Sequence, residues 1–193
     1  MKSFRSVSLV LALSLVLMQA QAQTEVPKGF KKGTITLADS SLLTGFIKES
    51  ISHNSSLQFI GTAGGKKKQY NGSDIIAAEI EGINYRCING DFFKVICQGE
   101  LFFLQKESDA SGKISYNGNE AVFSNGTDGK PGDYFIYAVA AKNLQLVSKK
   151  NFDEVVSASF GEYPAAMDKA RAASGDIAEL KDAVVIYNNR NSK

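Results

Sequence analysis

Few side chains in this protein have the chemistry of a catalytic or metal-binding group. Its 193 residues include one histidine, two cysteines and no tryptophan. A nucleophilic site of the Ser/His/Asp or Cys/His type would have to use His53, which lies between the turn-forming residues Ser52 and Asn54. Loops of this composition run over the protein surface. The sequence therefore predicts an exposed histidine and no catalytic role for it.

Carboxyl groups are the remaining catalytic candidates, because two of them can hydrolyse a glycosidic bond that lies between them. The candidates are Asp74, Glu79, Glu81 and Glu100. Nothing in their spacing brings two of them to the same bond, and the tryptophan platforms common in carbohydrate sites are absent. A carboxylate-based, glycan-directed hydrolase is therefore an alternative prediction. The main prediction contains no catalytic residue.

Two loops have a superficial likeness to nucleotide- and calcium-binding loops. Residues 61–66 are rich in glycine, but their spacing differs from that of a phosphate-binding loop, and Lys67 replaces the hydroxyl residue that would contact magnesium. Residues 125–133 contain Asp128-Gly129-Lys130 but lack the terminal glutamate of a calcium loop. The lysines at 66–68 could contact phosphate or an acidic glycan, although a solvated loop is the simpler interpretation. We expect no cofactor-binding residue and no metal site.

The first 22 residues have the three parts of a secretory signal peptide. Lys2 and Arg5 are positively charged, and residues 7–18 are nearly all apolar. Ala20-Gln21-Ala22 has the small residues that a signal peptidase recognises, so we expect cleavage between Ala22 and Gln23. About 12 apolar residues are too few to cross a bilayer. No cysteine directly follows this stretch to accept a lipid.

Export would also change the charge of the chain. Cleavage would leave 171 of the 193 residues and remove Lys2 and Arg5, which account for the whole formal charge of +2. A neutral chain argues against a nucleic-acid partner, which usually needs a basic surface. No later stretch is long and apolar enough to span a membrane. We expect the protein to lie in the periplasm or to be extracellular, on the outer surface of the cell. It would have no transmembrane segment after the signal peptide is removed.

An exported chain meets oxidising conditions, in which Cys87 and Cys97 could form a disulfide. If residues 89–90 form a two-residue hairpin turn, Cys87 faces Phe92, whereas Cys97 faces Gly82 on the other side of the ribbon. This pairing favours two buried free thiols, and a bridge between them remains an alternative. Two cysteines without a nearby histidine do not form a zinc site.

Turn residues divide residues 29–147 into short alternating segments that are typical of β-strands. The predicted strands are 33–37, 43–47, 57–59, 75–80, 83–88, 92–97, 100–104, 112–116, 119–124, 134–139 and 143–147. Asn117-Gly118 favours a type I′ hairpin turn. After residue 147 the apolar spacing becomes helical. Asn151 and Glu154 predict a capping box at the start of a first helix. Pro164 predicts the start of a second helix, and Asp176 predicts the start of a third.

The predicted fold is therefore α+β and mainly β. Residues 23–147 would form an antiparallel sheet, sandwich or barrel-like body. Residues 148–193 would add two to three short helices, packed on that body as part of the same globular unit. The adjacent phenylalanines at 92–93 and 102–103 must point to opposite faces of their strands. Either both faces are covered there, or one ring of a pair is exposed for a partner.

The order of these segments resembles that of exported proteins of unknown function from Bacteroidetes-type bacteria. The resemblance rests on a signal peptide ending in Gln-Ala-Gln and on residues 33–39, 43–47, 93–102, 134–136, 144–146, 150–152, 176–177 and 183–188. It implies an envelope location, a β-rich body and a C-terminal helical segment that ends in Tyr-Asn. The sequence departs from that pattern at residues 161–164, where an Asp-Cys-Pro type of turn is expected. The resemblance implies no activity and no catalytic residues.

Together these features predict a non-catalytic binding or envelope-associated module. Its partner would be an unknown envelope protein or a glycan. The hydrolase alternative requires two carboxyl groups about 5–9 Å apart in a cleft. A further alternative, a carrier of a small apolar ligand, requires an enclosed apolar cavity of roughly 300 Å3 or more.

Overall fold

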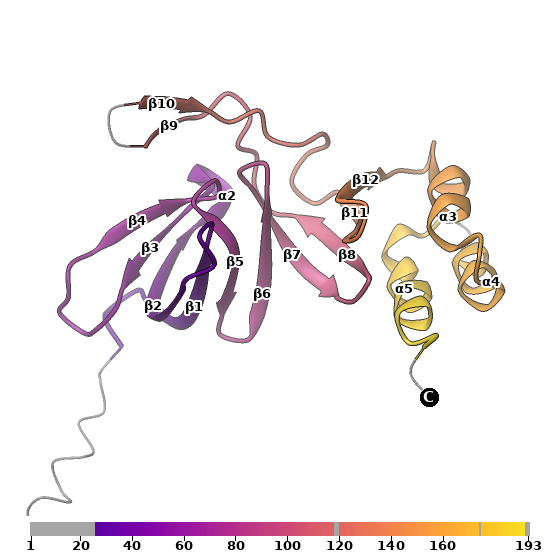
Figure 1. The fold of residues 1–193 in the computed structure, drawn as a ribbon, viewed down its shortest axis with the longest axis horizontal. Coiled ribbons are helices and arrows are strands. Elements are labelled where there is room, and N and C mark those ends of the chain that lie inside the picture. Colours follow the sequence, from indigo (N-terminus) through magenta and orange to yellow (C-terminus); the bar gives the residue numbers. More distant parts are fainter. Residues whose placement is uncertain (1–25, 118–119, 174, 192–193) are drawn as a thin grey trace, which may run out of the picture.

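In the computed structural model, which describes residues 26–117, 120–173 and 175–191, ten strands form one antiparallel sheet (Figure 1). From edge to edge the strands are β12 (Asn143–Val147), β11 (Tyr134–Ala138), β8 (Leu101–Lys106), β7 (Asp91–Cys97), β6 (Ile83–Ile88), β5 (Ile75–Ile80), β1 (Lys31–Leu37), β2 (Leu42–Ser50), β3 (Ser56–Ile60) and β4 (Lys68–Asn71). The predicted signal peptide and its Ala22–Gln23 cleavage site lie outside the described residues.

The remaining elements are a two-stranded ribbon and short helices. Strands β9 (Ile114–Asn117) and β10 (Glu120–Phe123) pair only with each other. The helices are α2 (Ile51–Asn54), α3 (Phe152–Phe160), α4 (Pro164–Ala172), the 3-10 turn η2 (Ile177–Glu179) and α5 (Leu180–Asn188). The mainly β fold class, the antiparallel sheet and the position of the helices at the C-terminal side are confirmed.

Turn chemistry explains why the central strands lie where the sequence predicts them. Asn89 and Gly90 both have positive φ, 50° and 87°, as a type I′ turn requires. The turn pairs β6 with β7 so that Cys87 faces Phe92, as predicted. The predicted Asn117-Gly118 turn includes undescribed residues, although the two strands on either side of it do pair. Two elements were not predicted, namely β4 and α2.

The first part of the sheet curls around its own core. Tyr70 of the edge strand β4 and Phe92 of β7 belong to one buried cluster, so strands far apart in the sheet bring their side chains together. Two glycines that face each other, Gly33 in β1 and Gly45 in β2, allow this curvature. A Cβ at Gly33 would collide with the carbonyl oxygen of Glu79 in β5, because the backbones approach closely there.

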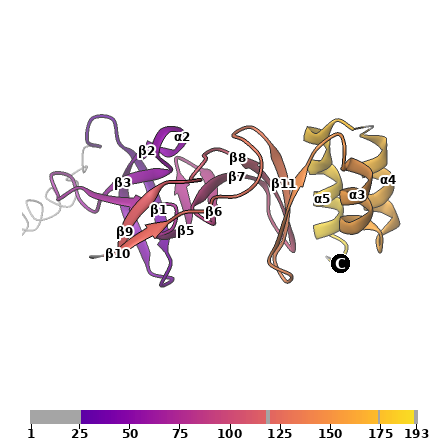
Figure 2. The same cartoon turned by 90° about the horizontal axis from the view of Figure 1, so that it is seen from above.

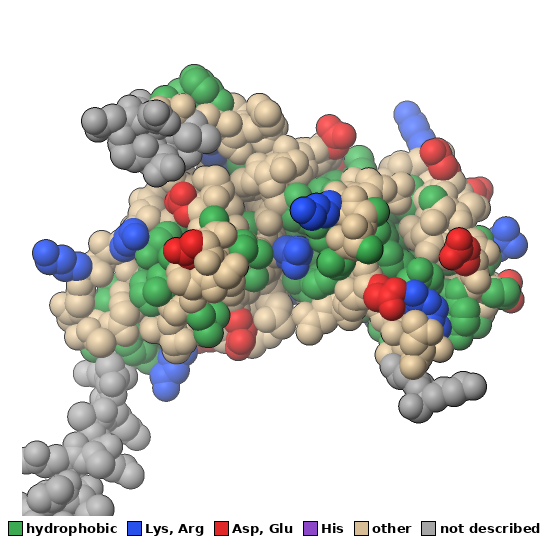
Figure 3. All heavy atoms as spheres, viewed as in Figure 1, with side chains coloured by type: hydrophobic (Ala, Val, Ile, Leu, Met, Phe, Trp, Pro, Cys, Tyr) green, Lys and Arg blue, Asp and Glu red, His purple; other side chains and the backbone are tan. Residues whose placement is uncertain are grey.

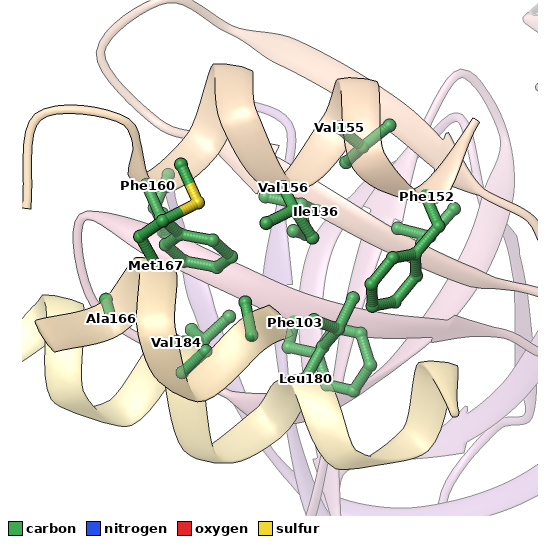
Figure 4. Close-up of a cluster of buried hydrophobic side chains, with 14 residues drawn as sticks. Phe103, Ile136, Phe152, Val155, Val156, Phe160, Ala166, Met167, Leu180 and Val184 are labelled. Carbon is green, nitrogen blue, oxygen red and sulfur yellow. The ribbon is translucent and has the colours of Figure 1, made fainter. Parts of the chain in front are cut away.

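The C-terminal helices cover one face of β8, β11 and β12. Figure 4 shows Phe103 and Ile136 of the sheet among helix side chains that include Phe152, Phe160 and Val184. The opposite face of the sheet has its own cluster, formed by Phe93 of β7, Leu104 of β8, and Phe135 and Tyr137 of β11. Both rings of the pair at 92–93 are fully buried, so both faces are covered at that point. Phe102, in contrast, is only partly buried.

All three helix starts agree with the sequence, but the capping interaction predicted at the first of them does not form. Pro164 is the first residue of α4, and the Asp176 carboxylate accepts a hydrogen bond from the Ala178 amide at the start of η2. The capping box predicted at Asn151 is wrong. Its Oδ1 instead accepts from the amide of Ser148 at 2.7 Å, and its Nδ2 donates to the carbonyl of Leu146 at 2.8 Å. Asn151 therefore stabilises the turn before the helix rather than the helix end.

The end of α5 is attached to the sheet by one side chain. Asn188 Oδ1 accepts from the Leu101 amide at 3.0 Å, and its Nδ2 donates to the Leu101 carbonyl at 2.8 Å. The side chain thus pairs with β8 as a neighbouring strand would. Gly99 leaves room for it, because a Cβ there would overlap the Asn188 side chain.

A buried ion pair joins β7, β8 and the long segment that follows β8. Lys106 Nζ and Asp91 Oδ2 lie 3.1 Å apart, and both side chains are 0% exposed. The Lys106 ammonium also donates to the carbonyls of Thr127, Asp128 and Gly129, at 2.7, 3.3 and 3.1 Å. The Asp91 carboxylate accepts from the Ala110 amide at 2.6 Å. Further bonds come from the amide and hydroxyl of Thr127, at 2.7 and 2.6 Å.

Replacing one member of this pair should strongly destabilise the fold. In Asp91→Asn the Lys106 ammonium remains buried without its counter-charge, which typically costs about 3–5 kcal/mol. Urea unfolding should show this loss in the free energy of unfolding. Asp182→Asn is the matched control, because it removes an ion pair of similar length, 3.0 Å to Lys169, in which both side chains are exposed. Exposed ion pairs contribute about 1 kcal/mol or less to stability. Equal unfolding midpoints for the two variants would contradict the structural role of Asp91.

Candidate functional site

The β9–β10 ribbon projects over the sheet at the end opposite the C-terminal helices (Figures 1 and 2). Ile114 and Phe123 face each other across its two strands. They are among the most exposed apolar side chains of the described part of the chain, at 52% and 67%. A two-stranded ribbon is marginally stable by itself in water. Its position must therefore be determined by contacts of its two ends with the body of the protein.

Those contacts gather at the base of the ribbon. Lys113 Nζ donates to the His53 carbonyl at 3.2 Å and to the Ser55 hydroxyl at 3.1 Å. On the other strand, the Ser124 hydroxyl donates to the Asn89 carbonyl at 3.1 Å. The Ser124 amide also donates to the Lys113 carbonyl, which closes the base. The ribbon is thus attached to α2 on one side and to the β6–β7 turn on the other.

Two glycines let the turns of the body meet beneath the ribbon. A Cβ at Gly72 would collide with the Gly90 carbonyl, and one at Gly90 would meet the Ser124 hydroxyl. Both glycines are buried. The turn after β4 and the β6–β7 turn therefore pack in backbone contact, with the Ser124 side chain at the base of β10 against them.

A groove runs along this meeting point, which we call the ribbon groove. It consists of two neighbouring pockets of about 370 and 510 Å3 that share Gly72, Ser73, Gly90 and Ser124. Both are open to the surface. The other lining residues are Ala38, Asn54, Ser55, Gln69, Asn71, Ile75, Ile76, Cys87, Asn89, Ala110, Lys113, Ile114, Phe123 and Asn125.

The lining is polar but almost uncharged. Amide and hydroxyl side chains, which can both donate and accept hydrogen bonds, make up its polar part. Lys113 is the one ionised side chain among the described lining residues, and its ammonium is occupied by His53 and Ser55. Ile114 and Phe123 add apolar surface from the ribbon. The arrangement can bind a neutral polar ligand that also has an apolar face.

The two cysteines are free thiols. Cys87 contacts the core inside the curled sheet, whereas Cys97 contacts the core beneath the helices. Cys97 lies five residues beyond Phe92, the partner of Cys87, which is on the order of 15 Å along a strand. A disulfide needs Cα atoms only about 4–7 Å apart. The predicted alternative of a Cys87–Cys97 bridge is therefore absent, because the strand pairing separates the residues.

Cys87 does not supply a nucleophile to the ribbon groove. Burial raises the pKa of the Cys87 thiol far above its usual value, and Asp91 adds to this effect, while Arg86 opposes it. Burial also raises the pKa of Cys97. The thiolate is the reactive form of cysteine, so both side chains are poor nucleophiles.

The other candidate residues from the sequence do not converge. His53 is exposed, and its Nδ1 lies 3.0 Å from the Ser52 hydroxyl. The Asp74 carboxylate accepts from the Asn71 amide at 2.8 Å and so stabilises a turn. Glu100 forms an ion pair with Arg190 at the far end of the sheet. None of the three is a lining residue of the ribbon groove.

Glu79 and Glu81 do line one pocket together, an open hollow of about 560 Å3 beside Lys32 and Gly45. Both glutamates are exposed, and the Glu81 carboxylate lies 3.4 Å from Lys31 Nζ. The general acid of a glycosidase is typically sequestered from water. This pocket does not provide that environment.

The loops singled out in the sequence have structural roles. Residues 61–67 connect two strands, with no helix after them, and Lys68 Nζ lies 4.6 Å from the centre of the Tyr70 ring. Residues 125–133 do surround a cation with carbonyl oxygens, but that cation is the ammonium of Lys106. Within the described ranges no group of three or more His, Cys, Asp or Glu side chains could hold a metal ion.

The residues of the ribbon groove were missed by sequence reasoning. Asn54, Asn71, Ser73 and Asn125 have the composition of ordinary turns, and they are distant from one another in the sequence. Gly72 carried the only local signal, because a glycine next to a strand can indicate close backbone approach. That signal does not identify the backbone that approaches.

Comparisons with known proteins add no family to this description. No protein-family model, curated protein or solved structure gives a significant match to the chain. No helix in the described part of the chain has the length and apolar character needed to cross a membrane. On the face drawn in Figure 3, Lys and Arg side chains are scattered among Asp and Glu rather than gathered in a basic patch.

The thiol environment leads to a labelling prediction. In the Cys97→Ser variant, Cys87 is the one remaining thiol. At pH 8 it should react with iodoacetamide at least about tenfold more slowly in the folded protein than in the urea-unfolded protein, because its raised pKa lowers the thiolate fraction. The rate should rise with pH as the thiol ionises. Mass spectrometry of timed samples measures both rates. Equal rates in the folded and unfolded protein would contradict the buried environment of Cys87.

Proposed function

We propose that this protein is an exported, non-catalytic binding module of the bacterial envelope and that the ribbon groove binds a neutral glycan. The observation that carries the proposal is the lining of the groove. Its polar side chains are amides and hydroxyls, its one described charge, on Lys113, already donates hydrogen bonds within the protein, and an exposed phenylalanine stands at its edge. Glycans present many hydroxyl groups together with apolar ring faces, which this lining complements.

The dimensions of the groove support a ligand of this size. Its two pockets of about 370 and 510 Å3 lie within the range of small-molecule sites, roughly 300–1,000 Å3. Ser73 and Ser124 line both pockets, so a chain of several sugar units could contact both at once. The buried contact between Gly72 and Gly90 makes the floor rigid, which reduces the entropy lost on binding.

Export is proposed from the N-terminal sequence. Lys2 and Arg5, the apolar run and Ala20-Gln21-Ala22 favour secretion with cleavage before Gln23. The resemblance to exported proteins of Bacteroidetes-type bacteria supports the same location. A periplasmic or outer-surface protein would meet envelope glycans directly.

Two other functions have weaker support. A glycan-directed hydrolase would have to use Glu79 and Glu81, and both are exposed at the surface. A carrier of a small apolar ligand would need an enclosed cavity, whereas the described pockets are open to the surface. The ribbon groove combines a rigid floor with hydrogen-bonding side chains, and neither alternative accounts for that combination.

Glycan binding can be tested on residues 23–193 by calorimetric titration with cellotetraose, xylotetraose, maltotetraose and chitotetraose. At least one should bind, and Phe123→Ala should weaken it roughly two- to tenfold through the loss of an aromatic contact. Val185→Ala is the matched control, because Val185 is also exposed and apolar but lies on α5. Absence of binding to all four sugars at millimolar concentration, or equal weakening in both variants, would contradict the proposal.

Export can be tested in the host cell. Mass spectrometry of the protein from the envelope fraction should give a mature N-terminus at Gln23, either free or cyclised. Ala20→Arg with Ala22→Arg should block cleavage and leave a larger species, because signal peptidase needs small residues at these positions. A wild-type chain that still begins at Met1 in the envelope would refute the signal peptide.

A further inference from the structure

A second polar feature lies on the outer face of the sheet, away from the ribbon groove. Arg86 of β6 faces Ala77 of β5 and Phe93 of β7. Side chains directly opposite in an antiparallel pair share one face. Arg86 therefore points away from the core inside the curled sheet and towards the face that carries Phe93.

Two aromatic rings hold the Arg86 guanidinium. Its central carbon lies 5.0 Å from the centre of the Phe102 ring and 5.1 Å from that of Tyr137. These rings are themselves in edge-to-face contact, 6.4 Å apart. Cation–π attraction and the limited rotation of the rings restrict where the guanidinium can go. The otherwise unexplained partial exposure of Phe102 is part of this arrangement.

In the described part of the chain the guanidinium has no partner that would neutralise it. Among the described residues no carboxylate lies within ion-pair distance of Arg86, and its side chain has no described hydrogen bond. Arginine normally uses its planar fork of N–H groups to bind a carboxylate or phosphate with two parallel hydrogen bonds. The Arg86 guanidinium is half-buried, is kept in place by two aromatic rings and has N–H groups without a described acceptor. It is therefore preorganised to bind such an anion.

Arg86 opens into a pocket of about 440 Å3 that has both polar and apolar walls. Thr36, Asn84 and Gln98 offer further hydrogen-bonding groups. Val95 on the neighbouring strand β7 and the Phe102 ring provide apolar surface beside Arg86. No lining residue of this pocket belongs to the ribbon groove.

One charge in the pocket opposes an anion. Glu79 lies two residues from Ala77 on β5 and therefore shares the face of Arg86, as a diagonal neighbour at roughly 7–8 Å. Its carboxylate is exposed and screened by water, whereas Arg86 is partly buried. The two charges do not form an ion pair, so Glu79 weakens the attraction for an anion without blocking the guanidinium.

We propose that the Arg86 pocket binds the carboxylate of a ligand that also carries a short apolar group. The carboxylate pairs with the guanidinium, and the apolar group lies against Val95 and the Phe102 ring. A fatty acid and the C-terminus of a peptide that ends in an apolar residue share this chemistry. The site is separate from the ribbon groove and does not depend on the function proposed for it.

Titration followed by NMR tests the proposal on residues 23–193. Hexanoate represents the fatty acid and N-acetyl-leucine the peptide C-terminus. At least one should cause saturable shifts in the Arg86 side-chain N–H signal and in the methyl signals of Val95. Hexanol, which lacks the carboxylate, and acetate, which lacks the apolar group, should both bind at least about tenfold more weakly. The probe with the lower Kd indicates the source of the ligand.

Three variants make the outcome decisive. Arg86→Lys keeps the positive charge but lacks the planar fork, and it should raise the Kd at least about tenfold. Glu79→Gln removes the repelling charge and should lower the Kd about two- to fivefold. Phe123→Ala, in the ribbon groove, should leave the Kd unchanged. Unaltered binding in Arg86→Lys, no saturable shift with either probe, or equal affinity for inorganic phosphate would overturn the proposal.

Discussion

The buried contact between Asp91 and Lys106 determines where the proposed ribbon groove lies. It ties the start of β7 and the end of β8 to residues 107–133, a long segment with little regular structure of its own. Three carbonyls of that segment surround the Lys106 ammonium, and two of its amides and one hydroxyl surround the Asp91 carboxylate. Charges removed from water must be fully paired and hydrogen-bonded. The segment can therefore leave the sheet and return to it along one path, with the β9–β10 ribbon at its far end.

The two ends of the molecule use apolar surface differently. At the C-terminal end, α3, α4 and α5 fill the space above Phe103 and Ile136, and Asn188 closes the edge of β8. At the other end, the ribbon leaves Ile114 and Phe123 exposed above a floor of glycine, serine and asparagine. One end is a closed core and the other an open surface. The proposed ribbon groove and Arg86 pocket are both lined by residues outside the core beneath the C-terminal helices.

The sequence-based predictions agree with the structure where the interactions that determine an element act between residues close together in the chain. β5, β6 and β12 have the bounds predicted from alternation and turn residues, and Asn89-Gly90 forms the expected turn. β4 was missed because Lys68, Gln69 and Asn71 are polar residues of an exposed edge strand, which gives no alternating pattern. The capping box at Asn151 failed because nearby backbone groups of Ser148 and Leu146 compete for the same side chain. The spacing of the candidate carboxylates could not show that Glu79 and Glu81 line one pocket, and the ribbon groove had no sequence signature.

Local sequence therefore determined the mainly β class, most strand positions, the helical C-terminus and the scarcity of reactive side chains, because alternation, turn preference and composition act over a few residues. Long-range contacts determined the rest. The proximity of Gly72 to Gly90, the cage of carbonyls around Lys106 and the position of Arg86 over Phe102 and Tyr137 each join residues that are distant in the chain. Such contacts depend on how the whole sheet curls, and the side chains that form them look like ordinary turn or strand residues until the strands are assembled.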